Sequence, residues 1–406
     1  MKKVIFGLCL LLIAGCSYNR PPAGDKVTNQ EIGWTAQSGA IASGDKTSSN
    51  GVSRGNNITP ERAKPILAQL KLPEGFQIEV FAQVPNARSL AVAYDEKRNR
   101  QVVFVGNKDE SSVYALIDEG ADYTVDAVKT IVKGRKTPNG VAFHDGNLYV
   151  AQVSTIHEFP NILDNLDNEG EIPSTIVYDK LPSDTHHGWK YIAFGPDDKL
   201  YIPVGAPCNT CVRDLPYASI QALDMTTKEL TTVAKGIRNT VWFTRHPYTK
   251  ALWFTDNGRD SLGDTIPPDE LNKLSSIGED FGFPACGGTQ TLDKGADCSK
   301  TTMPQVTLGA HVAALGMKFY TADQFPKQYK NQVFIAEHGS RNSSTPVGYR
   351  VTMVNPETKT YEVFIDWWLS AGKTWGRPVD VLQLKDGSLL ISDDYAGLVY
   401  RVAYTK

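Results

Sequence analysis

Hydrophobic and polar positions follow one recurring pattern along most of the chain: an alternating run, a turn, and then a second apolar run. Six copies begin at Ser89, Asn139, Tyr191, Thr240, Leu315 and Val379. Apolar positions with a period of two predict strands, and the DG, DD or Pro-containing turns between them are typical of hairpins. A repeated hairpin unit without intervening helices predicts an all-β, six-bladed β-propeller. A large sandwich, or a propeller of five or seven blades, is the alternative.

The N-terminal stretch MKKVIFGLCLLLIAGC has a different pattern. Lys2 and Lys3 precede an apolar run, residues 4–14, that is too short to cross a bilayer as a helix. The run ends in LIAGC, which resembles a bacterial lipobox, where the cysteine is lipidated. We predict a lipoprotein signal over residues 1–16 with lipidation at Cys16, and a lipid-anchored protein on the periplasmic side of the bacterial envelope, at the outer membrane. An ordinary secretory signal is the alternative.

Residues 17–60 are predicted to form a flexible tether. The stretch SGAIASGDKTSSNGVSRGNN is rich in Gly, Ser and Asn and lacks the apolar periodicity that a packed core requires. Thr59 and Pro60 then have the chemistry of a helix start, as the cap and the first helical residue, and Pro65 indicates that the helix is either short or begins later. The propeller is assigned to residues 61–406.

Export changes how the four remaining cysteines are interpreted. In an oxidising compartment, an even count favours disulfides. Proximity in sequence suggests the pairs Cys208–Cys211 and Cys286–Cys298, although four cysteines permit three pairings. CNTC could instead hold a metal or act as a redox dithiol, but no second CxxC or histidine pair completes a zinc site. The formal charge of −3 and the pI near 6.2 argue against nucleic acid as a partner.

Chemically active residues recur just outside the repeated strands. His187 precedes the third copy, and a histidine there can take up a proton near neutral pH. Arg238 and Asn239 precede the fourth copy, and EHGSRN and GRPVD place His338, Arg341 and Arg377 near the fifth and sixth. The alternative for His187 is a turn histidine without a role, and the alternative for Arg238 is a surface salt bridge. Recurrence at matching positions predicts a polar or anionic ligand on the propeller axis.

A long insertion, roughly residues 256–314, separates the fourth and fifth copies. It contains DNGRDSLGDTIPPDELN, whose acidic and amide oxygens are the ligand type that Ca²⁺ prefers. The spacing differs from that of an EF-hand, and a solvated acidic loop is the alternative. Long loops on a rigid scaffold often form binding sites, and a bond between Cys286 and Cys298 would constrain this one.

Several long motifs together resemble a known family. HHGWKYIAFGPDDKLYIPVGAPCNTC, GIRNTVWF, WFTDNGRDSLGDTIPPDELN, HGSRNSSTPVGYRV and GRPVDV with DGSLLISDDYAGLVYRV are similar to the sorbosone dehydrogenase-like proteins. These belong to the superfamily of soluble quinoprotein sugar dehydrogenases. The resemblance covers roughly residues 70–406.

The resemblance implies a six-bladed propeller that binds pyrroloquinoline quinone (PQQ) and Ca²⁺ at the mouth of its channel. By matching position, His187 is implied as the general base and His186 as a cofactor contact, and Arg238 with Asn239 contacts the quinone. The calcium loop maps onto Asn257, onto Gly258 through its carbonyl, and onto Asp269. Arg341 and Arg377 are the remaining cofactor-binding candidates. Val379 replaces the second arginine of the family's last-blade motif.

The implied reaction is the oxidation of an aldose or a sorbosone-like sugar aldehyde by hydride transfer to PQQ. Its partners would be the small-molecule substrate and an electron acceptor, either a quinone or a cytochrome, which the sequence does not identify. A Ca²⁺-dependent, lactonase-type hydrolase and a non-catalytic binding lipoprotein of the envelope are the alternatives, since propellers serve many functions.

Overall fold

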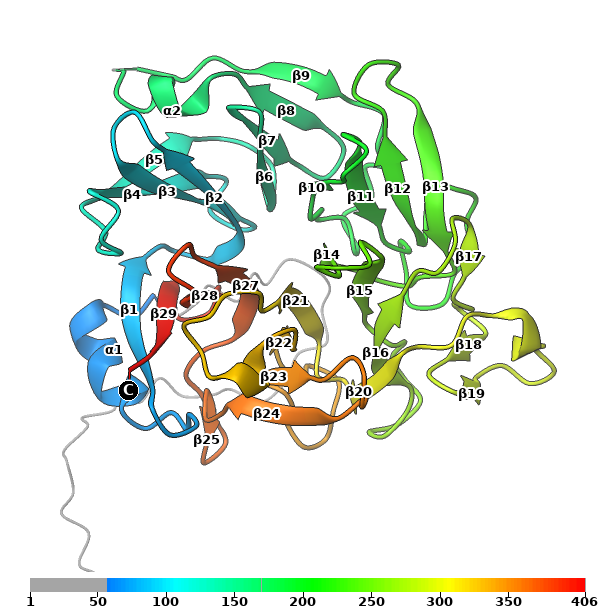
Figure 1. Ribbon diagram of the computed structural model, residues 1–406. Coiled ribbons are helices and arrows are strands. Elements are labelled where there is room, and N and C mark those ends of the chain that lie inside the picture. The colour runs from blue at the N-terminus through cyan, green and yellow to red at the C-terminus, as the bar shows by residue number, and fades with distance from the viewer. Residues whose placement is uncertain (1–56, 169, 406) are drawn as a thin grey trace, which may run out of the picture. The chain divides into compact units, whose positions relative to one another are not determined.

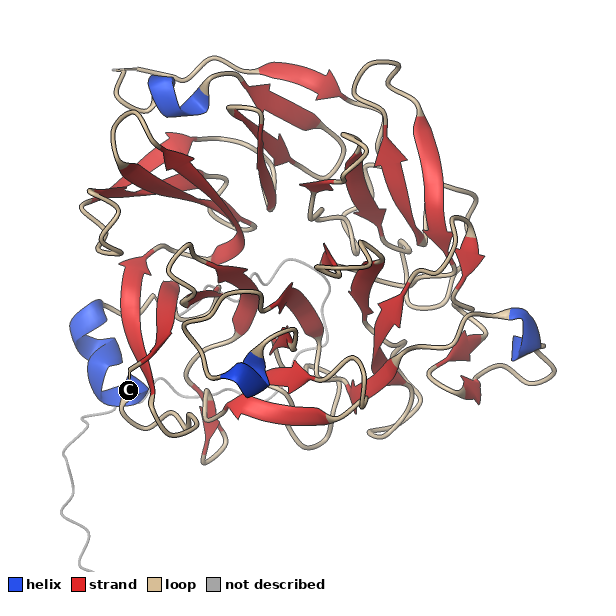
Figure 2. Ribbon diagram, viewed as in Figure 1, coloured by secondary structure: helices blue, strands red, loops and turns tan. Residues whose placement is uncertain are grey.

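The computed structural model of the protein describes residues 57–168 and 170–405. Figure 1 shows six β-sheets arranged radially around a common centre, and Figure 2 shows that the helices are short and lie at the periphery. Each sheet is the unit that one hydrophobic copy predicted. The six-bladed propeller is therefore confirmed, and the sandwich and the five- and seven-bladed alternatives are wrong.

The first three blades follow one another along the chain, and each begins with its innermost strand. Blade one contains β2 (Ala87–Asp95), β3 (Arg100–Asn107), β4 (Val113–Glu119) and β5 (Ala127–Val132). Blade two contains β6 (Gly140–His144), β7 (Asn147–Ala151), β8 (Ile156–Phe159) and β9 (Thr175–Tyr178), with the short helix α2 (Ile162–Asn165) before β9. Blade three contains β10 (Ala193–Phe194), β11 (Leu200–Val204), β12 (Ser219–Leu223) and β13 (Leu230–Lys235), and β17 (Glu279–Asp280) joins its outer edge.

Blades four to six include the insertion and the closure of the ring. Blade four contains β14 (Phe243–Arg245), β15 (Leu252–Asp256), β16 (Pro268–Lys273) and β20 (Val306–Ala310). Blade five contains β21 (Ala314–Phe319), β22 (Val333–Glu337), β23 (Arg350–Val354) and β24 (Tyr361–Ile365). Blade six contains β27 (Pro378–Gln383), β28 (Leu389–Asp393), β29 (Leu398–Tyr404) and β1 (Phe76–Gln83). Two small hairpins, β18 (Cys286–Gly287) with β19 (Gln290–Thr291) and β25 (Leu369–Ser370) with β26 (Lys373–Thr374), lie outside the blades.

The ring closes by pairing the two ends of the described chain. β1 pairs with β29 in antiparallel register, from Phe76 opposite Tyr404 to Gln83 opposite Leu398. The outermost strand of the last blade therefore comes from the beginning of the propeller. Helix α1 (Pro60–Leu67) packs on β1 and contributes Ala63 and Leu67 to the same hydrophobic cluster. This closure joins segments more than 300 residues apart, and the repeating pattern did not predict it.

Six hydrophobic clusters occupy the spaces between neighbouring blades of the described chain. One cluster, for example, joins Phe104 of blade one to Leu148 of blade two, and another joins Leu252 of blade four to Ile220 of blade three. Because each blade is covered on both faces, its second strand is buried along its whole length, as in β3, β11, β15, β22 and β28. This explains why the second run in each copy is continuously apolar, whereas the first alternates.

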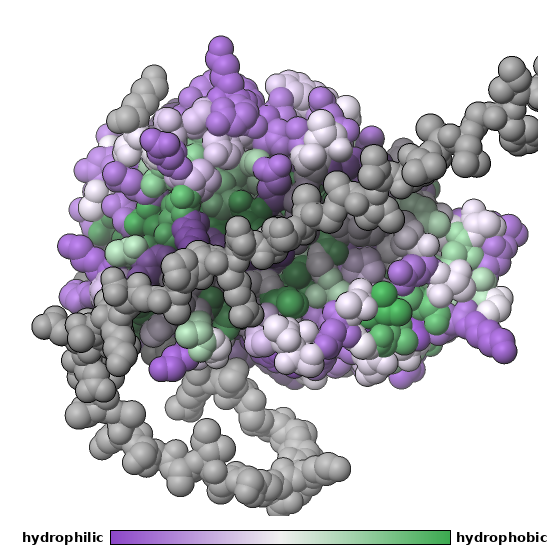
Figure 3. Space-filling view, turned by 90° about the horizontal axis from the view of Figure 1, so that it is seen from below, coloured by the Kyte–Doolittle hydropathy of each residue, from purple (hydrophilic) through white to green (hydrophobic). Residues whose placement is uncertain are grey.

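Helix α1 begins where the sequence predicted. The Thr59 hydroxyl accepts a hydrogen bond from the Arg62 backbone N–H at 3.5 Å, Pro60 is the first helical residue, and the helix is short. The predicted signal, the lipidation at Cys16 and most of the tether lie outside the described residues. Within the described chain, no helix is long and apolar enough to cross a membrane. On the face that Figure 3 shows, hydrophilic residues dominate the outline and hydrophobic ones form patches between them.

Candidate functional site

A cavity of about 540 Å³ lies at one end of the propeller. Most of its lining residues lie at the start of the first strand of a blade or follow the second strand, and Asp269, in β16, is an exception. In an antiparallel hairpin, the start of the first strand and the end of the second meet at the same edge, so the repeat itself gathers these positions. The cavity is lined from blades one, three, four, five and six, and it includes all of the predicted site residues: His186, His187, Arg238, Asn239, Asn257, Gly258, Asp269, Arg341 and Arg377.

His187 is held in one orientation by a backbone carbonyl. Its Nδ1 lies 2.8 Å from the carbonyl oxygen of Ala206, and because a carbonyl only accepts, Nδ1 donates the hydrogen. In the neutral ring, Nε2 then has the free lone pair, and no partner for Nε2 is found among the described residues. His187 has a left-handed backbone (φ 51°), and Gly205 packs so closely that an added Cβ would lie 2.6 Å from the His187 Cβ. The site therefore presents a fixed hydrogen-bond acceptor to the cavity.

The electrostatic surroundings keep His187 neutral. Burial first, and then the positive charge of Arg238 and the neighbouring His186, lower the pKa of His187 to about 3. The folded site therefore holds the pKa of this imidazole well below its ordinary value. The ring of His186 lies 4.1 Å from that of His187 and is more exposed, and partial burial also lowers its pKa.

This lowered pKa predicts that His187 does not titrate between pH 5 and 8. A group whose pKa is about 3 is already deprotonated throughout that range, so its imidazole C–H resonance should stay constant in an NMR titration. The resonance is assigned from its loss in His187→Gln. In the urea-unfolded chain the same ring should titrate near its ordinary value of about 6.5. A folded-state midpoint between 6 and 7 would contradict the burial argument.

Arg238 and Asn239 are fixed from both their backbone and side chains. Asp256 accepts hydrogen bonds from the backbone N–H of Arg238 (2.9 Å) and of Asn239 (2.7 Å). Burial first, with Glu270 nearby, raises the pKa of Asp256 to about 8. The Asn239 amide donates to Asn257 Oδ1 at 3.1 Å, which connects the segment before β14 to the segment after β15. The Arg238 guanidinium pairs with Asp260 at 2.8 Å, with both groups lining the cavity.

Asn209, which the sequence analysis did not identify, lies in the CNTC loop and holds Arg238 by hydrogen bonds. Its side-chain Oδ1 accepts from Arg238 Nη2 (3.1 Å) and from the Asp260 backbone N–H (2.8 Å), while its backbone oxygen accepts from Arg238 Nε (3.2 Å). Cys208 and Cys211 form a disulfide around this residue, as their spacing suggested. The small ring therefore presents Asn209 to the arginine, and nothing in the local sequence indicated its target.

The predicted calcium residues lie together, but Asp269 is already engaged. Its Oδ1 accepts from the Gly258 N–H (2.9 Å), and its Oδ2 accepts from the Ala314 N–H (3.0 Å) and the Asn257 amide (3.4 Å). Within residues 57–168 and 170–405, no group of three or more His, Cys, Asp or Glu side chains is arranged to hold a metal. The oxygens of Asn257, Gly258 and Asp269 match Ca²⁺ in ligand type, so an ion here would depend chiefly on carbonyl and amide oxygens.

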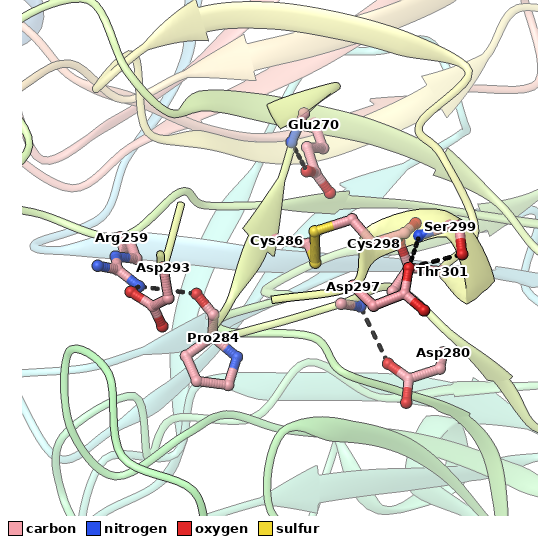
Figure 4. The surroundings of a disulfide bond; sticks show 12 residues. Arg259, Glu270, Asp280, Pro284, Cys286, Asp293, Asp297, Cys298, Ser299 and Thr301 are labelled. Carbon is pink, nitrogen blue, oxygen red and sulfur yellow. Dashed lines mark hydrogen bonds and ion pairs between the residues drawn. A yellow bond between two sulfur atoms is a disulfide. The ribbon is translucent and has the colours of Figure 1, made fainter. Parts of the chain in front are cut away.

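The other acidic residues of the insertion serve separate contacts rather than one metal cage. Glu270 accepts from the Gly288 N–H (2.5 Å) and the Asn272 amide (2.9 Å), and Asp264 accepts from Ser344 of blade five. Figure 4 shows the second predicted disulfide, Cys286–Cys298, with Arg259 nearby bonded to Asp293 and to the Pro284 carbonyl, both at 2.8 Å. The bond from Gly288 to Glu270 holds the insertion against β16 of blade four, and Asp264 joins it to blade five.

Blades five and six contribute a second charged group of residues. His338 Nε2 bonds Asp394 at 2.8 Å, and burial, followed by the charge of Arg377, lowers the pKa of His338 to about 3. Among the described residues, the Arg377 guanidinium donates to the backbone oxygens of His338 and Gly339, while its backbone N–H donates to Asp393. For the guanidinium of Arg341, which is exposed, no hydrogen bond or ion pair is found among the described residues. Both arginines therefore line the cavity, and neither guanidinium forms an ion pair with a carboxylate of the described chain.

Blade one adds two cations that the sequence analysis missed. Arg88, immediately before the first copy, pairs with Asp394 at 2.5 Å and donates to Asn139 Oδ1 at 2.6 Å. Lys108, immediately after the second strand of that copy, lines the cavity with its Nζ 4.6 Å from the ring centre of Trp189. Both occupy the positions relative to the strands that identified His187 and Arg341. The same rule applied to blade one would have found them.

Comparison with known proteins first identifies a family. Residues 62–402 match the family described as "Domain of unknown function (DUF7133)". A protein of Borreliella burgdorferi, described as an uncharacterized protein, is 33% identical over 363 residues, which is 85% of this chain and 93% of that relative.

Solved structures of similar fold include three named sugar-oxidising or carbohydrate-active proteins. The holo PQQ domain of pyranose dehydrogenase from Coprinopsis cinerea has a TM-score of 0.69, with 16% identity over 82% of this chain and 97% of that chain. The calcium structure of the Trichoderma reesei enzyme of carbohydrate-active family AA12 has a TM-score of 0.67, with 16% identity over 83% and 97%. The apo soluble aldose sugar dehydrogenase from Escherichia coli has a TM-score of 0.58, with 16% identity over 81% and 99%. At this identity the similarity establishes the fold, and the narrower resemblance to sorbosone dehydrogenase-like proteins stays a prediction.

Proposed function

The chain belongs to the DUF7133 family, and we propose that it is a quinoprotein dehydrogenase that oxidises the CH–OH group of an aldose or of a hydrated, sorbosone-like sugar aldehyde. The single observation that supports this most strongly is the orientation of His187, a neutral imidazole with a free Nε2 lone pair beside the fixed pair Arg238–Asn239. A base with this geometry can remove a hydroxyl proton while a hydride leaves the same carbon.

His187 is the proposed general base. The substrate hydroxyl donates to Nε2, and the proton moves to Nε2 as the C–H bond breaks and the carbonyl forms. The bond from Nδ1 to the Ala206 carbonyl favours this step, because the imidazolium keeps that N–H donor and its acceptor (2.8 Å). Release of the proton to water is favoured in turn by burial and by Arg238, the same influences that lower the pKa of His187. The base is therefore regenerated after each turnover.

The other cavity residues fit an anionic cofactor. PQQ has several carboxylates, and Arg341 and Arg377 line the cavity without carboxylate partners of their own. Arg238 and Asn239 offer fixed N–H donors to an oxygen that gains negative charge during the reaction. When bound, PQQ would supply the hydride acceptor, and Ca²⁺ near Asn257, Gly258 and Asp269 would polarise it. The printed names of the fold neighbours, which include a PQQ domain and an aldose dehydrogenase, support this choice of cofactor.

The cellular setting is also proposed. Lipidation at Cys16 would anchor the enzyme on the periplasmic side of the envelope, where it would pass electrons to a quinone or cytochrome. The amino-terminal pattern MKKVIFGLCLLLIAGC supports this part of the proposal. Mass spectrometry of the membrane fraction tests it, because a lipidated chain begins at Cys16, and Cys16→Ala should abolish the modification.

The deciding experiment measures cofactor binding separately from turnover. The purified chain is titrated with PQQ in the presence and absence of Ca²⁺ by fluorescence and calorimetry, and dye reduction is then followed with aldoses and sugar aldehydes. Saturable binding with cofactor-dependent turnover supports the proposal. No binding at high micromolar PQQ overturns it, and lactone hydrolysis is then the next assay.

Asn209→Ala should lower kcat/KM about tenfold. The substitution removes three hydrogen bonds, in which Oδ1 accepts from Arg238 and from the Asp260 N–H and the amide donates to the Asp260 carbonyl, and a bond to a charged group contributes roughly 1.5 kcal/mol. We expect kcat to fall more than KM rises, because Arg238 is proposed to act on developing charge. Thr210→Ala, an exposed residue in the same disulfide ring, is the matched control. Equal kinetics for the two variants would refute a role for Asn209 in holding Arg238.

A further inference from the structure

Positive charge exceeds negative charge on one side of the cavity. Arg88 and Lys108 of blade one, Arg341 of blade five and Arg377 of blade six line it there. Asp394 is the lining carboxylate of this side, and it already bonds Arg88 and His338. Because an uncompensated cation in a partly desolvated site is unfavourable, the arrangement calls for anionic ligand groups.

Lys108 is the cation of blade one whose charge is available to a ligand. Within the described chain, its one ion pair is with Asp109, at 3.9 Å, which is a weak contact, and Asp394 acts on it at longer range. Burial, and then the charge of Arg88, lower the pKa of Lys108, so the ammonium gains little from its surroundings. Arg88 differs, because Asp394 and Asn139 occupy its guanidinium at 2.5 and 2.6 Å.

Trp189 brings Lys108 into contact with the segment that carries His187. Trp189 follows His187 by two residues, both line the cavity, and the Lys108 Nζ lies 4.6 Å from the Trp189 ring centre. Arg341 and Arg377, the cofactor candidates, come from blades five and six, and the charge of Arg341 also acts on Lys108. A sugar whose reacting carbon contacts His187 would share the cavity with Trp189 and Lys108, and an indole face also suits sugar C–H groups.

We propose that Lys108, lying over Trp189, binds an anionic group at the remote end of the substrate, so that this enzyme prefers acidic sugars, carrying a carboxylate or a phosphate, to neutral aldoses. This inference rests on the proposed function and specifies its substrate class. A lysine ammonium acts as a point charge and can bind either a carboxylate or a phosphate, so the proposal covers both kinds of acidic sugar.

The experiment compares D-glucose, D-glucuronate and glucose 6-phosphate as substrates of the PQQ-loaded chain. The wild type should have at least a tenfold higher kcat/KM for one acidic sugar than for glucose, and which acidic sugar it is identifies the anion. Lys108→Met should lower kcat/KM for that acidic sugar about tenfold and should change kcat/KM for glucose less than threefold. Lys108→Arg should retain the preference. Lys97→Met, an exposed lysine at the opposite edge of the same blade, is the matched control.

A binding measurement separates this proposal from the proposed function. Calorimetry with methyl β-D-glucuronide, whose C1 oxygen is methylated so that it resists oxidation and whose carboxylate is at C6, reports recognition of the remote anion without turnover. Binding by the wild type that Lys108→Met weakens tenfold, at an unchanged unfolding midpoint, supports the anion site even if no sugar is oxidised. The acidic-sugar inference is overturned if neutral aldoses are oxidised as efficiently as acidic sugars, or if Lys108→Met lowers kcat/KM equally for glucose and for acidic sugars. Either result leaves the proposed dehydrogenase function unaffected.

Discussion

His187→Ala is expected to lower kcat/KM for PQQ-dependent sugar oxidation by about 10³-fold, within the range of roughly 10²–10⁴ for loss of a positioned general base. The Nε2 lone pair, directed by the bond from Nδ1 to Ala206, is the group that receives the substrate proton. Alanine removes that acceptor and leaves Arg238 and its hydrogen bonds to Asn209 in place. Stopped-flow reduction of the bound cofactor by sugar measures the affected step directly.

Two controls make this result specific to His187. PQQ affinity should change by less than a few fold in His187→Ala, since the proposed cofactor contacts of Arg238, Arg341 and Arg377 remain. His186→Ala, the adjacent and more exposed ring, should lose less than about tenfold. If His187→Ala keeps a tenth of the wild-type rate, or if His186→Ala loses as much, the base has been assigned to the wrong residue.

Phe76→Ala is expected to reduce the free energy of unfolding by about 3–5 kcal/mol, the usual cost of removing a buried phenylalanine ring. Phe76 begins β1, the strand that closes the propeller, and its ring centre lies 4.7–5.1 Å from four other aromatic rings: Phe325, Tyr329, Phe364 and Tyr404. The substitution opens a cavity between blades five and six at the point of closure. Equilibrium urea unfolding, followed by tryptophan fluorescence, measures the loss.

Gln77→Ala provides the comparison at the next position of β1. Its side chain is exposed, so its effect should stay within about 0.5 kcal/mol. Phe76→Leu, which keeps part of the buried volume, should fall between the two. A Phe76→Ala midpoint equal to that of Gln77→Ala would mean that the closure between β1 and β29 contributes little to stability.

Repetition made the blades predictable. A period of two specifies which side chains face one side of a strand, and six copies of one hairpin unit leave few architectures that can bury all of them. The same repetition located most of the site, because matching ends of the strands meet at one edge of the propeller. His187, Arg238, Arg341 and Arg377 could therefore be named from their position relative to a strand and from their chemistry.

Contacts between distant segments could not be predicted in this way. Asn209 contacts Arg238 across 29 residues, and Arg88 pairs with Asp394 across 306. Asp269 could be recognised as a carboxylate, but its three N–H donors come from Gly258, Ala314 and Asn257, and they were apparent only in the folded chain. An acidic, glycine-containing loop is compatible with a metal site and with backbone support alike, since both use the same oxygens.

The sequence by itself therefore determined the six blades, the end of the propeller at which the chemically active residues gather, the short helix at Thr59–Pro60 and the two disulfides between near neighbours. These depend on local periodicity, turn chemistry and short separations. Only the tertiary structure decided that β1 completes the last blade, that His187 is neutral with its Nε2 free, and that Lys108 lies over Trp189 without a close carboxylate partner among the described residues. Those properties depend on burial and on charges from other blades. The local pattern of hydrophobic and polar residues specifies neither of them.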